Sequence, residues 1–209
     1  TLIDGTDFQA MLNVNHPTYL IRAPRSTGDV FLDYLVLGVR HIWGGLDHLL
    51  FVFGLLLLIA GPRRLLWTIT AFTLGHSVTL ALATLGVIQY PVDLIEVLIA
   101  ISVFTLAVTL TSKNQERLLW RSPGWLAAGF GLLHGMGFAG ALLEIGLPSK
   151  NLLLALFSFN AGIEVGQILF IVAFLLPWHY LKKRSSRRFG VARWASIYLL
   201  GSLAAYWTV

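Results

Sequence analysis

Six long apolar segments dominate the sequence, and each is near or above the roughly 20 residues that cross about 30 Å of hydrocarbon as a helix. They are Tyr34–Ala60, Leu65–Ile88, Val92–Thr111, Trp125–Ile145, Leu152–Trp178 and Val191–Trp207. Backbone polar groups find no water in lipid, so such segments cross as helices. The sequence therefore predicts an all-α, polytopic membrane helix bundle of about six transmembrane helices, or seven if the amphipathic start of the first segment forms an interfacial helix.

The composition excludes the common soluble classes. Of the 209 residues, 56% are hydrophobic and only 12% are charged, whereas soluble domains carry about 25% charged residues. This argues against a dinucleotide-binding enzyme or a nucleic-acid module, and the lipid bilayer is the expected partner, with no nucleic acid. Because the chain has no cysteine, it has no disulfide, thiolate metal site or thiol nucleophile.

Basic residues between the apolar segments predict the topology. The loops after the first, third and fifth segments carry Arg63 and Arg64, then Lys113, Arg117 and Arg121, then Lys182, Lys183, Arg184, Arg187 and Arg188. The other two loops hold only Lys150. Because basic loops stay in the cytoplasm, both termini are expected to be extracytoplasmic, in a multi-pass protein of the bacterial inner membrane.

Residues 1–30 are polar, mixed in composition and interrupted by Pro17, Pro24 and Gly28. We expect them to form an extracytoplasmic linker or tail, followed by a transmembrane helical domain over residues 31–209. An N-terminus outside the cytoplasm needs an export signal. Since the chain starts at Thr1 and shows no signal peptide, we expect a processed or truncated product.

Ionisable and polar side chains recur inside five of the apolar segments, where a charge costs at least about 2.5–3.5 kcal/mol on insertion scales. In chain order they are His41, Asp47, His48, His76, Glu96, His134, Asn160, Glu164 and Gln167. The last three are spaced so that they form one stripe along a helix. The positions of all nine within their segments place them in the middle and outer half of the membrane. We expect them to face the bundle interior and to meet there.

The first segment leaves two arrangements open. His41 and His48 are seven positions apart and share one helix face, but a regular helix keeps them about 10 Å apart, too far to chelate one ion. Either the adjacent Gly44 and Gly45 bend the helix, or His41 lines an entrance while Asp47 and His48 form a deeper site.

Imidazole and carboxylate groups without thiolate suit Ni²⁺, Zn²⁺, Co²⁺ or Fe²⁺. We expect a divalent transition metal ion, Ni²⁺ or Zn²⁺, at a site whose ligands are His41, Asp47, His48, His76, His134 and Glu164. The expected supporting polar residues are Ser77, Glu96, Asn160 and Gln167. The plain alternative is that these groups only hydrogen-bond across helices, at about 0.6 kcal/mol each.

Four blocks in order resemble the HupE/UreJ family. HIWGGLDHLLF (residues 41–51) resembles its opening motif, and AFTLGHSVTL (71–80), GFGLLHGMGFA (129–139) and FNAGIEVGQ (159–167) resemble its later blocks. The resemblance implies an accessory protein of hydrogenase or urease systems, or a nickel or cobalt permease. It also implies that His41, Asp47 and His48 bind metal, with His76 in the second block and His134 and Glu164 in the later ones.

Three functions remain open at this point. The first is a nickel permease, in which the outer His and Asp residues capture the ion and His76, His134 and Glu164 pass it inward. The second is an intramembrane zinc-dependent hydrolase of a lipid or peptide, with Glu164 or Glu96 as general base and Ser77 assisting. The third is a structural or assembly partner that a metal stabilises.

Overall fold

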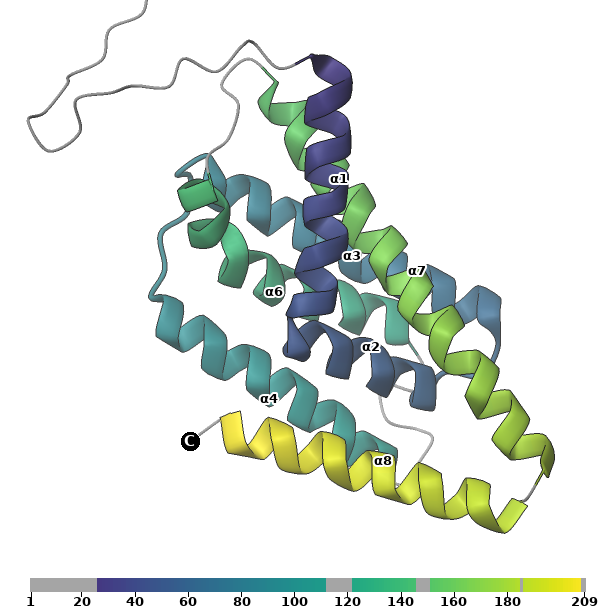
Figure 1. The fold of residues 1–209 in the computed structure, drawn as a ribbon. Helices are drawn as coiled ribbons and strands as arrows, with labels where there is room; N and C mark the ends of the chain where they lie inside the picture. The colour runs from purple at the N-terminus through teal and green to yellow at the C-terminus, as the bar shows by residue number, and fades with distance from the viewer. Residues whose placement is uncertain (1–25, 112–121, 146–150, 185, 208–209) are drawn as a thin grey trace, which may run out of the picture.

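A computed structural model describes residues 26–111, 122–145, 151–184 and 186–207. Every regular element in these ranges is a helix, which confirms the predicted all-α fold (Figure 1). The helices are α1 (Thr27–Gly44), α2 (Leu46–Leu58), α3 (Pro62–Thr84), α4 (Val92–Thr111), α6 (Pro123–Ile145), α7 (Leu152–Arg184) and α8 (Ser186–Trp207). The predicted tail falls mostly on residues 1–25, outside the described residues, as do Lys113, Arg117, Arg121 and Lys150 of the topology argument.

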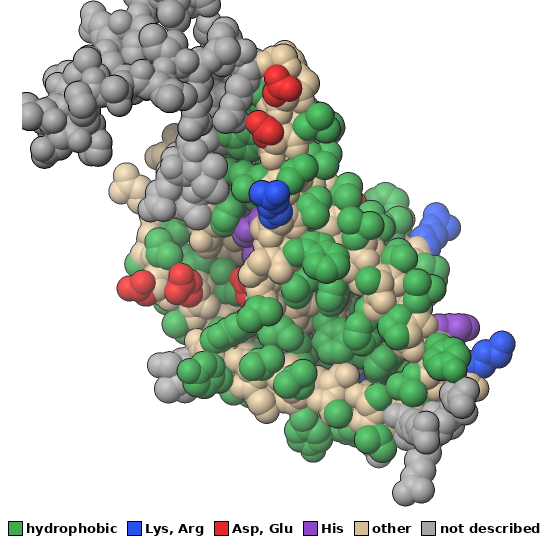
Figure 2. Space-filling model, viewed as in Figure 1, with side chains coloured by type: hydrophobic (Ala, Val, Ile, Leu, Met, Phe, Trp, Pro, Cys, Tyr) green, Lys and Arg blue, Asp and Glu red, His purple; other side chains and the backbone are tan. Residues whose placement is uncertain are grey.

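Several helices have the length and apolar character of membrane spans. Among the described residues, α3, α4 and the Leu152–Leu181 part of α7 meet this description, and α1 with α2 meets it as one bent pair. This gives three spans, or four with the bent pair. Helices α6 and α8 overlap the other two predicted segments, and α8 begins at Ser186 rather than at the predicted Val191. Figure 2 shows apolar side chains spread widely over the described part of this face. Among the exposed apolar residues, Trp125 is 84% exposed, as expected of a surface against lipid.

The first predicted segment forms two helices, α1 and α2, with a bend between them at the glycine pair. The axes of α1 and α2 differ by 75°, because Gly45 adopts an extended conformation (φ −88°, ψ 101°) between them. Helix α1 begins at Thr27, earlier than predicted, where Ser26 and Asp29 form a capping box. The Ser26 hydroxyl accepts from the Asp29 backbone N–H at 3.1 Å, so two backbone donors at the helix start are satisfied.

Local signals fix the ends of α3, which begins and ends a few residues earlier than predicted. Gly61 precedes it with a φ of +96°, a conformation that favours glycine, and Pro62 occupies the first turn. At the other end Gly86 has a φ of +72° and its N–H donates to the Ala83 carbonyl. This is the glycine stop of a Schellman-type cap.

Glycines bring two helix pairs into backbone contact. Helix α1 packs along α7 through Gly38 and Gly162, and α3 packs along α6 through Gly75 and Gly131. At each of these glycines an added Cβ would overlap a backbone atom of the facing helix, so only glycine permits this approach. Figure 1 shows α1 beside α7, and α4 beside α8 along another edge of the bundle.

The buried apolar residues form two clusters, one that includes Phe51 and Phe72 and another that includes Phe159. Histidine rings touch both. The ring centroids of His134 and Phe72 are 5.1 Å apart, and those of His41 and Phe159 are 5.4 Å apart. The histidines therefore sit where the two clusters meet, inside the bundle.

Candidate metal centre

Four imidazole rings from four helices meet inside the bundle: His41 from α1, His48 from α2, His76 from α3 and His134 from α6. The centroid distances are 4.6 Å for His41–His48, 4.9 Å for His48–His134, 5.8 Å for His48–His76 and 5.9 Å for His41–His76. The break at Gly45 places His41 and His48 together. The structure thus has the bent arrangement of the two that the sequence left open.

Three of these histidines form a group that could hold a metal ion. One ring nitrogen from each of His41, His48 and His76 lies within 4.8 Å of the other two. Two nitrogens that bind one ion at about 2.1 Å lie at most about 4.2 Å apart. The widest pair therefore has to close by no more than about 0.6 Å to share an ion.

Among the described residues, one ring nitrogen of each histidine in the cluster is buried and has no hydrogen-bond partner in the protein. In the described part of the chain, Nε2 of His41, His48, His76 and His134 is buried and makes no hydrogen bond. Leaving one buried polar atom unpaired costs about 1–3 kcal/mol. Four unpaired nitrogens in one cluster are therefore expensive unless a ligand binds them.

The other nitrogen of three rings is held by an oxygen atom. His48 Nδ1 lies 3.0 Å from Asp47 Oδ1, His76 Nδ1 lies 3.4 Å from Asn160 Oδ1, and His134 Nδ1 lies 2.8 Å from the Phe130 carbonyl oxygen. The Asn160 amide is oriented by its own N–H₂ group, which donates to the Leu156 carbonyl at 2.7 Å. All three partners therefore present acceptor oxygens.

These oxygens determine which ring nitrogen is free. A carboxylate or carbonyl oxygen accepts a hydrogen bond from Nδ1–H, so in the neutral ring Nε2 keeps its lone pair. Metal-binding histidines are held in the same way, by a second-shell acceptor that fixes the ring and its tautomer. The hydrogen bonds of His48, His76 and His134 thus prepare their Nε2 atoms to bind a cation.

A small cavity of about 130 Å³ adjoins the cluster. It is lined by His41, Asp47, His48, Glu96, Ile99, His134, Gly137 and Phe138. A larger cavity of about 430 Å³ shares Asp47, Glu96 and Ile99 with it. The carboxylates of Asp47 and Glu96 therefore lie where the larger cavity meets the histidines. The Asp47 side chain is 29% exposed, whereas that of His48 is only 4% exposed.

The polar stripe predicted on α7 faces α3. Asn160 contacts His76, Gln167 Oε1 accepts from the Thr73 hydroxyl at 3.1 Å, and Glu164 Oε1 accepts from the Thr70 hydroxyl at 2.5 Å. Glu164 is thus placed on the α3–α7 contact, and the group of three ring nitrogens includes none of its atoms. Ser77 donates to the Thr73 carbonyl at 2.6 Å.

Two partners in this region escaped the sequence argument. Thr70 carries a weak signal, because it lies three residues before Thr73 on the same helix face. The Phe130 carbonyl carries none, since a backbone acceptor four residues before a histidine exists in every helix. Only the side-chain rotamer of His134 decides whether it is used.

The fold and the cluster together define a helical membrane protein with three buried or half-buried imidazoles that could hold a metal ion. Residues 17–209 match the family described as HupE / UreJ protein, and the chain belongs to this family. The resemblance in the sequence blocks is thereby confirmed. Searches of curated proteins and of solved structures give no match.

Proposed function

We propose that the protein is a permease for a divalent transition metal ion, with Ni²⁺ as its substrate, in the bacterial inner membrane with both termini extracytoplasmic. The observation that supports this most is the set of four buried Nε2 atoms, from four different helices, that have no partner among the described residues. Membership in the HupE/UreJ family supports the same direction, because the family is associated with nickel and cobalt handling.

The ligand chemistry is suited to Ni²⁺. The cluster offers imidazole nitrogens with carboxylates nearby and no thiolate. Nitrogen-rich sites bind Ni²⁺ more tightly than Co²⁺ or Fe²⁺ and exclude Mg²⁺ and Ca²⁺, which prefer oxygen. Zn²⁺ is the nearest competitor for such a site.

The cavities and polar contacts suggest a route. Asp47 and Glu96 line both cavities and would attract a hydrated cation toward the histidines. Beyond His76, the hydrogen bonds of Thr73 and Thr70 continue along α3 toward its start, next to the basic pair at residues 63–64. We propose that the ion leaves along this side, past Glu164, toward the cytoplasm.

The family match gives no support to the intramembrane zinc hydrolase. Of its two expected bases, Glu164 is engaged by the Thr70 hydroxyl. Glu96 lines the cavities. An acidic side chain in this position is as consistent with attracting a cation as with acting as a general base.

Uptake of radioactive Ni²⁺ into proteoliposomes tests the proposal. We expect His76→Ala to lose at least about tenfold in uptake, since it removes one prepared ligand. His179→Ala is the matched control because His179 is exposed near the end of α7 and should leave uptake unchanged. Thermal melts and gel filtration of each variant separate loss of transport from loss of folding.

Two outcomes would overturn the permease. One is uptake no faster than in empty liposomes by a folded, Ni²⁺-binding protein, which would favour a structural or assembly role. The other is equal uptake by the parent protein and the His76→Ala variant. Release of a lipid or peptide fragment dependent on Zn²⁺ would instead restore the hydrolase.

A further inference from the structure

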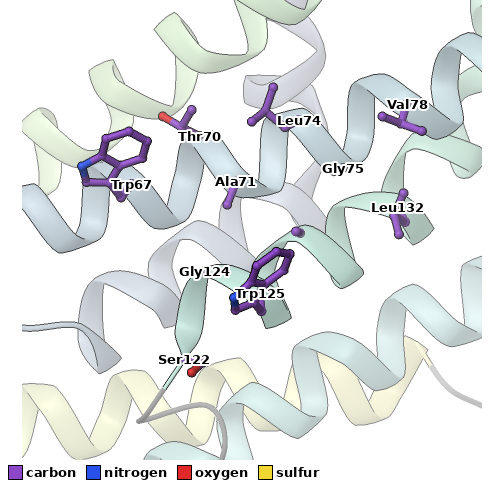
Figure 3. Close-up of a pocket in the computed structure, with 11 residues that line it drawn as sticks. Trp67, Thr70, Ala71, Leu74, Gly75, Val78, Ser122, Gly124, Trp125 and Leu132 are labelled. Atoms are coloured by element: carbon purple, nitrogen blue, oxygen red, sulfur yellow. The ribbon is translucent and has the colours of Figure 1, made fainter.

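An apolar groove of about 620 Å³ runs along the outer faces of α3 and α6 (Figure 3). Its walls include Trp67, Ala71, Leu74 and Val78 from α3 and Trp125 and Leu132 from α6. None of the histidines of the candidate metal centre lines it. The groove is therefore a separate feature of the molecule.

Small residues at the helix contact create the hollow. Gly75 and Ala128 line the groove at a place where the two backbones are in close contact, and larger side chains flank them. Trp67, Trp125 and Leu74 are 67%, 84% and 63% exposed. A hydrocarbon chain could lie between these side chains and cover apolar surface that is otherwise exposed.

One end of the groove is basic. A second hollow, of about 560 Å³, surrounds the start of α3 and is lined by Gly61, Pro62, Arg63, Arg64 and Trp67. Trp67 belongs to both hollows, so the apolar groove adjoins the hollow that Arg63 and Arg64 line. Gly61 offers no side-chain cap, so this helix end adds the partial positive charge of its backbone N–H groups.

The groove has the length of one membrane leaflet. From Trp67 to Val78 is 11 residues, or about 16 Å at 1.5 Å per residue. Half of the hydrocarbon thickness is about 15 Å. Trp67, next to the arginines, occupies the position that interfacial tryptophans take at the level of lipid headgroups.

We propose that this groove is a binding site for an anionic phospholipid. One acyl chain lies between α3 and α6, and the phosphate group is bound by Arg63 and Arg64 through charge-assisted hydrogen bonds. Charge complementarity favours this occupant over a second copy of the chain or a partner's apolar helix, because neither of those needs two guanidinium groups at the groove end. The proposal depends on the membrane placement of α3 and not on metal transport.

The lipid would have a mechanical effect on the metal centre. It would contact both α3 and α6, the helices that carry His76 and His134. By covering the groove along Gly75, the acyl chain would hold these two helices together.

Native mass spectrometry of the delipidated full chain, titrated with phosphatidylglycerol or with phosphatidylcholine of the same acyl chains, tests the proposal. We expect phosphatidylglycerol to bind more tightly, and the double variant Arg63→Gln, Arg64→Gln to lose about fivefold for each arginine removed. The matched control removes two exposed charges elsewhere, at Arg40 and Lys183, and should keep the preference.

A second pair of variants tests the groove itself. Ala71→Phe fills the hollow and should weaken the binding of both lipids, whereas Ala173→Phe, on an exposed position of α7, should not. Equal binding of the two lipids, insensitive to the arginine and Ala71 variants, would overturn the proposal. So would a dimer that forms through this face and resists displacement by phosphatidylglycerol.

Discussion

His48 occupies the central position among the four imidazoles, because its ring centroid lies within 6 Å of the other three. Its orientation depends on the Asp47 carboxylate, 3.0 Å from Nδ1. We expect Asp47→Asn to lower the Ni²⁺ affinity about 10–100-fold without unfolding the protein, because the neutral amide oxygen of Asn accepts a hydrogen bond more weakly than the carboxylate does and so weakens a second-shell contact. Competition with a metal-chelating dye in detergent measures this affinity.

Asp93 provides the control for that substitution. It lies exposed in the first turn of α4, in a segment that contains none of the four histidines. Asp93→Asn therefore makes the same change of charge as Asp47→Asn and should leave the Ni²⁺ affinity unchanged. An Asp47→Asn variant that binds Ni²⁺ as tightly as the parent protein would show that the carboxylate neither orients His48 nor binds the ion.

The identity of the clustered residues could be predicted from the sequence, because a histidine or carboxylate within an apolar segment is too expensive to face lipid. The structure brings the four predicted histidines together, with Asp47 and Asn160 as partners. The contact of Glu164 with Thr70 could not be predicted. It depends on how α7 crosses α3, and helical phase alone does not specify that crossing. The ligand roles of all these residues stay predictions.

At the scale of the helix, the break between α1 and α2 shapes the centre. A Cβ added at Gly45 would lie 2.9 Å from Asp47 Oδ1 and 3.0 Å from His48 Nδ1, whereas one added at Gly44 would meet nothing within 4 Å. We therefore expect Gly45→Ala to disturb the Asp47–His48 pair and weaken Ni²⁺ binding about tenfold. Gly44→Ala is the matched control. Equal affinities of the two variants, by dye competition, would contradict this account of the break.

Close packing of α3 against α6 allows a second matched pair. An added Cβ at Gly131 would overlap the Phe72 carbonyl of α3, whereas at Gly129 it would meet nothing within 4 Å. We expect Gly131→Ala to destabilise the protein by about 1–3 kcal/mol, as overpacking does. Gly129→Ala should be neutral or stabilising by up to about 1 kcal/mol, since alanine is the better helix former.

Thermal unfolding in detergent compares these two variants. The melting temperature should fall for Gly131→Ala alone, and Ni²⁺ affinity should fall with it, because α3 and α6 carry His76 and His134. A Gly131→Ala protein as stable as the Gly129→Ala protein would mean that the two helices are further apart than described.

Helix positions could be predicted closely where hydropathy changes abruptly. Helix α4 begins at Val92 and ends at Thr111, as predicted. The first segment could not be predicted as well, because its apolar run continues through the break and either of two adjacent glycines could have allowed a bend. The capping box at Ser26 also lay within a stretch whose polarity indicated a linker.

For the whole molecule, the sequence indicates a helix bundle but not which helices are neighbours. Helices α1 and α7 are far apart in the sequence, yet they pack against each other through glycines. Hydropathy measures only the preference of each segment for lipid. It does not describe which two segments bring their backbones into contact.

This arrangement predicts that the metal ion stabilises the entire bundle. The four histidines belong to α1, α2, α3 and α6, so an ion bound among them adds a direct link between these helices. An ion that binds only the folded state adds about 2.7 kcal/mol of stability at 100 times its dissociation constant. We expect the melting temperature to rise with Ni²⁺ concentration and to return to its starting value with a chelator.

Mg²⁺ is the control ion, because it prefers oxygen ligands and should leave the melting temperature unchanged. The His76→Ala protein should lose most of the Ni²⁺-dependent rise, whereas His179→Ala should keep it. A rise of the same size in the His76→Ala protein would place the stabilising ion elsewhere on the chain. No rise in the parent protein, at Ni²⁺ concentrations that support uptake, would mean that the ion does not bind the folded state in preference to the unfolded state.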